Sequence, residues 1–240
     1  MENFSITNLI ASLKTKSFSL TLYFLAVFIT ILGVILENEA MILFAKPIII
    51  PSIFFYYLSY NKGKANCVFV FIFLLYFITD MLVVLDIKHN SIVVIMLNAF
   101  AYLLIFYHIA REMIFNKIKK KIISYIILVC IVSIALLLFM NLLIQEEIKI
   151  VDLCYRVYSV ILFCLFLLVC YQFLSEDDMK GFIGLIMGFT FLFSDIFYVL
   201  YYFYAKLFIF KLIFICFQFL SYFYLVRYIT ASTNNKLNKV

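Results

Sequence analysis

The chain has 240 residues, of which 68% are hydrophobic and 13% are charged, and its mean hydropathy is +1.16. A soluble domain carries about 45–50% apolar and about 25% charged residues, and a chain of this length cannot hide such an apolar excess in a core. The composition excludes an ordinary soluble domain and predicts a protein embedded in lipid. The formal net charge is +6, but the basic residues stand mostly in short segments between apolar runs. We therefore expect contact with membrane lipids and none with nucleic acid.

Eight apolar runs approach the length of about 20 residues that a helix needs to cross a bilayer core of about 30 Å. In chain order they cover 18–36, 40–60, 66–86, 91–110, 121–144, 153–174, 181–204 and 207–229. The alternation of apolar and polar residues that marks a membrane β-barrel is absent. The sequence predicts an all-α polytopic membrane protein, a bundle of eight transmembrane helices. We expect one membrane domain over 1–240, with short cytoplasmic tails at 1–17 and 230–240.

The distribution of basic residues predicts the orientation of these helices. The first run follows Lys14 and Lys16 and ends without a small-residue cleavage motif, so we interpret it as a retained helix and not as a cleaved signal peptide. With the N-terminus inside, twelve Lys and Arg residues fall on the inner connections and tails. The outer connections carry only Lys88, Lys149 and Lys206. This bias places both chain ends in the cytoplasm. If the source is a bacterium, we expect the protein in the plasma (inner) membrane.

The cysteines and histidines do not form a pattern typical of metal ligands. All six cysteines lie inside or at the ends of apolar runs, without a Cys-x-x-Cys pair, and small buried hydrophobes are the usual role of such cysteines. The two histidines, His89 and His108, lie at opposite ends of one predicted helix. A three-histidine zinc site therefore cannot form from this chain. We expect no metal and no other cofactor.

Six ionisable residues lie inside the apolar runs and not in the connections. A central Asp, Lys or Arg costs about 2.5–3.5 kcal/mol on membrane-insertion scales, so such residues usually face the interior of a helix bundle. They are Lys46, Asp80, Arg156, Asp195, Lys211 and Arg227. We expect the functional site among them.

Three of these residues share one predicted depth. Lys46, Asp80 and Asp195 lie six to nine residues from the outer end of their runs, which places them in one layer at about 1.5 Å per residue. Asn98 falls in the same layer, and Tyr102 lies one turn deeper on the same face of its helix. A shared polar layer in the outer half of the bundle follows.

Two local patterns lie near this layer: one indicates close packing between helices, and the other indicates a kink. Gly184 and Gly188 form a Gly-x-x-x-Gly step, which permits close contact between helices, and Asp195 lies seven residues further on, in nearly the same helical direction. In the second run, Pro47 and Pro51 directly follow the buried lysine. Each proline removes an amide donor, so we expect a kink beside that cation.

Several short motifs resemble the YhhN or lysoplasmalogenase family. The most specific is Gly-x-x-x-x-Phe-Ser-Asp at 188–195, and the second to eighth predicted helices supply the others. These are Lys46-Pro47, Asp80, Tyr102 and Tyr158-Ser159. The resemblance implies an integral membrane enzyme with eight helices that hydrolyses the vinyl ether bond of lysoplasmalogens. Its products would be a fatty aldehyde and a glycerophospho-headgroup.

This chemistry needs an acid and a carboxylate. Protonation of the alkene carbon produces an oxocarbenium-like cation that water captures, as in glycosidases. We expect Asp80 and Asp195 to form the pair, with the choice of acid and base left open. Lys46 and Arg156 would attract the phosphate, while an amide and a phenol would orient water or the glycerol hydroxyl. The residues expected to bind the lysolipid substrate are Lys46, Asn98, Tyr102, Arg156, Tyr158 and Ser194.

Two other functions remain open at this point. A small-solute or proton-coupled transporter could use Asp80, Asp195 and Lys46 as a relay, but it needs a path to both sides, and the inner half of the bundle offers few ionisable residues. A catalytically inactive relative could bind lysolipid without turnover. Its support is Asn98, which stands where the family has a histidine.

Overall fold

The computed structural model describes residues 6–61, 65–85, 91–113, 120–144, 149–175 and 178–237, with side chains at 17–61, 65–85, 92–113, 124–144, 150–175 and 178–231. Within these residues the protein is all-α, with eight helices that are each long and apolar enough to span a membrane. The protein is therefore an integral multi-pass membrane protein, as the composition predicts. The helices are α1 (Ile6–Ile35), α2 (Glu39–Tyr60), α3 (Cys67–Val84), α4 (Ser91–Glu112), α5 (Lys120–Leu143), α6 (Lys149–Ser175), α7 (Met179–Val199) and α8 (Phe208–Leu237).

The first and last helices of the chain are longer than the apolar runs that predict them. The helix α1 begins at Ile6 and α8 continues to Leu237, so much of both expected tails, 1–17 and 230–240, is helical. Neither extension contains glycine or proline, and a helix already nucleated inside the membrane extends readily into water. The seventh run ends in a π-helical turn, η1 (Leu200–Tyr204), which closes with a 2.9 Å bond from the Ala205 amide to the Leu200 carbonyl.

Six of the helices form a closed ring. Neighbouring helices in contact follow the order α2, α3, α4, α6, α7, α8 and back to α2. Each helix therefore has one opposite partner across the ring, and α3 lies opposite α7. Among the described residues, no Cα atom of α3 comes within 8 Å of one in α7, so side chains fill the space between them.

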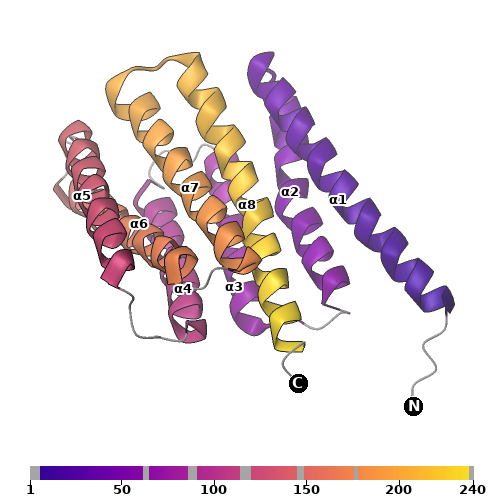
Figure 1. Cartoon of the computed structure of the whole chain (residues 1–240). Coiled ribbons are helices and arrows are strands. Elements are labelled where there is room, and N and C mark those ends of the chain that lie inside the picture. Colours follow the sequence, from indigo (N-terminus) through magenta and orange to yellow (C-terminus); the bar gives the residue numbers. More distant parts are fainter. Residues whose placement is uncertain are drawn as a thin grey trace.

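The helices α1 and α5 lie outside this ring, at opposite edges of the molecule (Figure 1). The helix α1 contacts α2 and α8, and α5 contacts α6 and the end of α7. Only 11% of the α5 span is buried by protein, which is the lowest share of the eight spans found in the described part of the chain. Large apolar side chains such as Phe44, at 77% exposure, and Leu142, at 73%, point outward and provide the surface for lipid.

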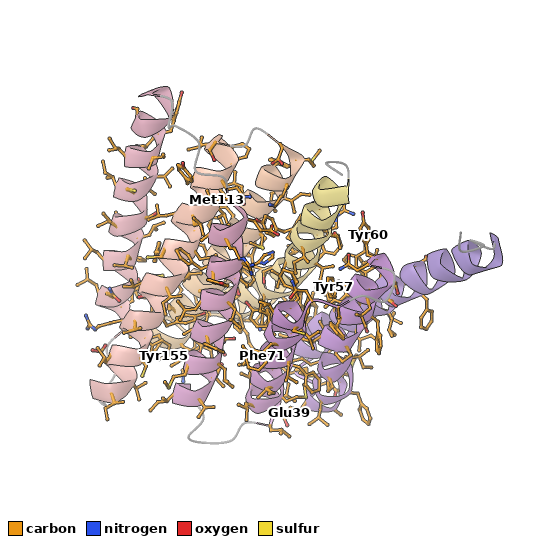
Figure 2. All side chains as sticks on the ribbon, turned by 90° about the horizontal axis from the view of Figure 1, so that it is seen from below. Glu39, Tyr57, Tyr60, Phe71, Met113 and Tyr155 are labelled. Atoms are coloured by element: carbon orange, nitrogen blue, oxygen red, sulfur yellow. The ribbon has the colours of Figure 1, made fainter. Side chains whose placement is uncertain are left out.

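The even number of spans brings both chain ends to one end of the bundle (Figure 1), which we call the terminal end. The opposite end, which we call the far end, holds the α1–α2 and α7–α8 connections. In Figure 2, Glu39 and Tyr155 are labelled toward the far end, and Tyr60 and Met113 toward the terminal end. Most of the basic residues that predict a cytoplasmic terminal end lie at positions whose side chains are not described, so that orientation stays a prediction.

The glycines of α7 let two neighbouring helices approach closely, as the Gly-x-x-x-Gly step predicts. A Cβ atom added at Gly188 would lie 2.5 Å from the Val169 Cγ2 atom on α6, and one added at Gly184 would lie 3.0 Å from the Tyr228 ring on α8. The face of α7 that carries the two glycines is therefore packed on both sides. In α2, both prolines lie inside a helix that continues from Glu39 to Tyr60.

Candidate functional site

Asp195 on α7 lies beside two tyrosines from different helices. The Tyr102 hydroxyl on α4 donates a 3.0 Å hydrogen bond to Oδ2 of Asp195, and the Tyr158 hydroxyl on α6 donates one of 2.6 Å to the same oxygen. The two phenol rings stack with centroids 5.6 Å apart. The other oxygen, Oδ1, receives no hydrogen bond from the described residues, and Asp195 keeps part of its surface accessible. One carboxyl oxygen is thus held and the other is left open.

Asp80 on α3 has a different environment, because a cation and two neutral donors surround it. The Gln218 side-chain amide on α8 donates to Oδ1 at 3.1 Å, and the Tyr222 hydroxyl donates to Oδ2 at 3.4 Å. The Lys46 ammonium on α2 lies 3.7 Å from Oδ1. Asp80 is 2% exposed, so its charge is compensated inside the protein and not by water. The sequence-based expectation that Lys46 and Asp80 share a layer is confirmed.

An aromatic bridge joins the surroundings of the two carboxyl groups. Tyr76, one turn before Asp80, stacks on Phe191, one turn before Asp195, with centroids 6.2 Å apart. The Tyr76 ring also contacts the Tyr222 ring at 5.0 Å, and Phe191 meets the Tyr102 ring at 5.1 Å. Four rings therefore connect the donors of one carboxyl to the donors of the other across the ring of helices.

The Tyr76 hydroxyl is the unusual group in this bridge. Tyr76 is 2% exposed, and its hydroxyl oxygen has no hydrogen-bond partner among the described residues. Its ring lies between Tyr222, which donates to Asp80, and Phe191, one turn before Asp195. A buried hydroxyl without a partner costs about 1–3 kcal/mol, and such a group usually indicates a position for water or a ligand atom.

The polar groups come from all six ring helices. Each ring helix contributes at least one member, so the site is a layer across the ring and not a patch on one helix. The members are Lys46 on α2, Asp80 on α3, Tyr102 on α4, Tyr158 on α6, Asp195 on α7, and Gln218 and Tyr222 on α8.

Three residues expected in substrate binding make no hydrogen bond to either aspartate in the described part of the chain. Arg156 is exposed and pairs with Asp152 on its own helix at 2.9 Å. Ser194 donates to the Phe214 carbonyl of α8 at 3.2 Å, so its hydroxyl connects two helices. Asn98 is partly exposed, and no hydrogen bond joins it to another described residue. A role for these three in binding stays a prediction without a contact to either aspartate.

Sequence reasoning missed Gln218 and Tyr222, which hold Asp80. Neither residue is charged, and tyrosine is too frequent in this chain, at 18 residues, to stand out. A signal did exist, because the two residues are four apart and so share a face of their helix. Gln218 also donates to the Tyr222 hydroxyl at 2.9 Å, which makes the pair one hydrogen-bonded unit.

A second polar cluster at the terminal end was also missed. The Lys180 ammonium on α7 lies 3.1 Å from Oε2 of Glu112 on α4, and both side chains are less than a tenth exposed. His108, one turn before Glu112, lies 3.4 Å from Oε1. Lys180 also lies over the Tyr228 ring of α8, 5.4 Å from its centroid. Lys180 is one of the twelve basic residues that the sequence assigns to the inner connections and tails, but its side chain points into the ring and pairs with Glu112.

The described residues contain no group of three or more His, Cys, Asp or Glu side chains that could hold a metal ion. The chemistry that the layer offers is that of two carboxyls, three phenols, one amide and one ammonium group, with the Tyr76 hydroxyl as a fourth phenol beside them. Carboxyls in dissimilar surroundings suit an acid and base pair, and aromatic faces suit a developing cation.

No protein-family model, curated protein or solved structure matches the chain. The likeness to the YhhN family therefore consists of the short motifs alone. Each of the five motifs places one side chain in the polar layer, and these are Lys46, Asp80, Tyr102, Tyr158 and Asp195. What the fold and composition establish is a multi-pass membrane protein with eight candidate spans in the described part of the chain.

Proposed function

We propose that this protein is a membrane hydrolase that cleaves the vinyl ether bond of lysoplasmalogen-type lysolipids to a fatty aldehyde and a glycerophospho-headgroup. The observation that carries the proposal is the unequal pair of carboxyls on opposite helices of one ring, the buried Asp80 and the partly accessible Asp195. Asp80 has a cation beside it, and Asp195 has only neutral donors among the described residues. This difference suits the division of labour in acid-catalysed hydrolysis.

In the proposed mechanism Asp195 is the acid. Its open oxygen delivers a proton to the alkene carbon that does not bear the ether oxygen. The alkene carbon bonded to that oxygen becomes an oxocarbenium-like cation. The faces of Tyr76 and Phe191 stabilise this cation by cation–π interaction. The Asp80 carboxylate contributes its negative charge and accepts a proton from the water that attacks.

The remaining steps return the site to its starting state. The captured water forms a hemiacetal, and cleavage of its bond to the glycerol oxygen releases the aldehyde. The hemiacetal hydroxyl gives up one proton and the glycerol oxygen takes one up. The proton that Asp80 accepted from the attacking water then returns to Asp195 through water, so the reaction consumes one water and no other reactant. The Tyr76 hydroxyl, which has no described protein partner, is the proposed donor or acceptor for that water.

The test uses purified protein and three lysolipids that differ only at the first glycerol position: vinyl ether, ester and saturated ether. Turnover confined to the vinyl ether is the expected result. Asp80→Asn and Asp195→Asn should each abolish aldehyde release while leaving the thermal unfolding curve nearly intact, since asparagine keeps the acceptor oxygen. The matched control is Asp152→Asn, which removes a partly exposed carboxylate outside the layer. Full activity in both site variants contradicts the proposal.

One observation favours a second candidate, a small-solute or proton-coupled transporter. Lys180, Glu112 and His108 give the terminal end buried ionisable groups, which a transporter requires on both sides of a central site. Uptake into sealed vesicles without aldehyde release would select this candidate. Binding of lysolipid with neither turnover nor uptake would select an inactive relative.

A further inference from the structure

A pocket of about 300 Å³ opens at the far end of the bundle, outside the polar layer. The α1–α2 turn forms one wall with Glu37 and Glu39, and the segment from η1 to the start of α8 forms the other with Lys206 and Lys211. The aromatic rings of Tyr201 and Phe208 complete the lining. The pocket therefore joins two connections that are far apart in the sequence.

The four charged side chains line this pocket without pairing with one another. Two are carboxylates and two are ammonium groups, yet none lies within 4.0 Å of an opposite charge among the described residues. Opposite charges that surround a shared space without contact suit a ligand that brings a charge of each sign. A simple anion or cation would satisfy only half of the lining.

The backbone holds one carboxylate in an unusual position. Glu37 has φ of 50°, in the left-handed region that favours glycine at the end of a helix. Two bonds hold the turn, from the Asn38 amide to the Gly33 carbonyl at 2.8 Å and from the Met41 amide to the Asn38 side chain at 3.1 Å. The chain therefore keeps a glutamate where glycine would be less strained, and its carboxylate lines the pocket.

The pocket lies above the Asp80 cluster on the same two helices. Glu39 precedes Lys46 on α2 by seven residues, and Lys211 precedes Gln218 on α8 by seven. Seven residues are nearly two turns, so each pair shares a helix face at a separation of about 10 Å. A small group in the pocket would lie directly over the layer that contains Asp80.

We infer that this pocket binds a zwitterion that carries a phosphate and an ammonium group, as in the phosphoethanolamine headgroup of a lysolipid. The lysines bind the phosphate and the two glutamates bind the ammonium. The inference rests on the proposed function for its lipid source. In that case the pocket selects the headgroup of the lysolipid, while the hydrocarbon chain of the lysolipid reaches the carboxyl layer. A free glycerophosphodiester presents the same chemistry from water.

The test measures binding and not hydrolysis, with the purified full chain in detergent. The probes are two lysolipids whose tails have the same length and are attached by a saturated ether bond. One carries a phosphoethanolamine headgroup, and the other carries the phosphate without the ammonium group. The double variant Glu37→Gln/Glu39→Gln should weaken binding of the zwitterionic probe about a hundredfold and leave the phosphate-only probe unchanged, since each of the two lost charged contacts is worth roughly one factor of ten. Lys206→Gln/Lys211→Gln should weaken both probes.

Asp152→Asn, a carboxylate near the same end but outside the pocket, is the matched control and should change neither affinity. Competition by glycerophosphoethanolamine at the affinity of the lysolipid would assign the site to the soluble source, and weak competition would assign it to the lipid. Equal loss for both probes in the glutamate variant, or loss for neither, overturns the inference. The binding probes have no vinyl ether bond, so their binding does not depend on hydrolysis. Selective binding by a protein that does not hydrolyse vinyl ether lysolipids therefore overturns only the proposed function.

Discussion

The contact between α6 and α7 predicts a large effect of the smallest possible substitution, Gly188→Ala. The added Cβ would lie 2.5 Å from Val169 Cγ2, whereas ordinary contacts begin at 3.4 Å, so it is about 0.9 Å too close. Val169 is fully buried and β-branched, which leaves its methyl group no room to turn away. The two helices must separate to accommodate the methyl group.

Overpacking of this kind costs about 1–3 kcal/mol in well-packed cores. For a chain of this size, 1 kcal/mol corresponds to roughly 2–4 °C in Tm, so we expect a decrease of several degrees. A thiol-reactive dye measures this once the exposed Cys67 and Cys164 have been blocked, because Cys170, next to Val169, is buried in the folded state and reacts on unfolding. Gly184→Ala should cost less, since its nearest neighbour is a tyrosine ring edge at 3.0 Å.

The double variant Gly188→Ala/Val169→Ala separates overpacking from other causes. Val169→Ala removes the Cγ2 atom that the new methyl group would meet, so Gly188→Ala should cost little in that background. A cost that is the same with valine and with alanine at position 169 refutes the packing explanation. The separation should also lengthen the 2.6 Å bond between Tyr158 and Asp195, which joins the same two helices.

Three further predictions follow from buried contacts. Glu112→Gln leaves Lys180 buried without a counter-charge and should cost about 3–5 kcal/mol in thermal unfolding, and adding Lys180→Met should recover part of the loss, whereas an unchanged Tm in the single variant contradicts the buried ion pair. Gln218→Leu removes the 3.1 Å donor from Asp80 and should cost about 1–3 kcal/mol, measured by the same dye, while Gln218→Glu should cost more because it places two carboxyls in contact. Tyr158→Phe removes the shorter of two donors to the carboxyl on α7 and should lower the rate of vinyl ether hydrolysis at least tenfold with little change in Tm, so an unaltered rate argues against a positioning role.

The helices could be predicted from sequence because bilayer thickness sets the length of each apolar run. The caps add local signals, as Asn38, Asn66 and Asp178 each accept a backbone amide at the start of a helix. Asp80 and Asp195 were predictable for the same energetic reason, since a carboxyl in an apolar run must face the bundle interior.

The order of helices around the ring was not predictable. Every ring helix is apolar on most of its surface, so sequence periodicity does not show which neighbours it meets. Lys180 and Glu112 lie at helix ends, where a charged side chain turns equally well to water or into the ring, and only their 3.1 Å contact decides. The same ambiguity applies to Tyr76, whose buried hydroxyl is distinguished from those of the other tyrosines by its neighbours alone.

The distribution of polar groups along the ring axis bears on the choice between hydrolase and transporter. Ile105 and Ile109 follow Tyr102 on the same face of α4, both are nearly fully buried, and they lead to Glu112. On α7, Met187 lies within the glycine step, seven residues after Lys180, and is fully buried. About 15 Å of helix therefore separates Tyr102 from Glu112, and apolar side chains occupy that stretch of the same face. A solute crossing the ring would have to displace this packing and then a buried ion pair, whereas a lysolipid that reached the polar layer from the far end would disturb neither. This arrangement favours a reaction site that opens on one side.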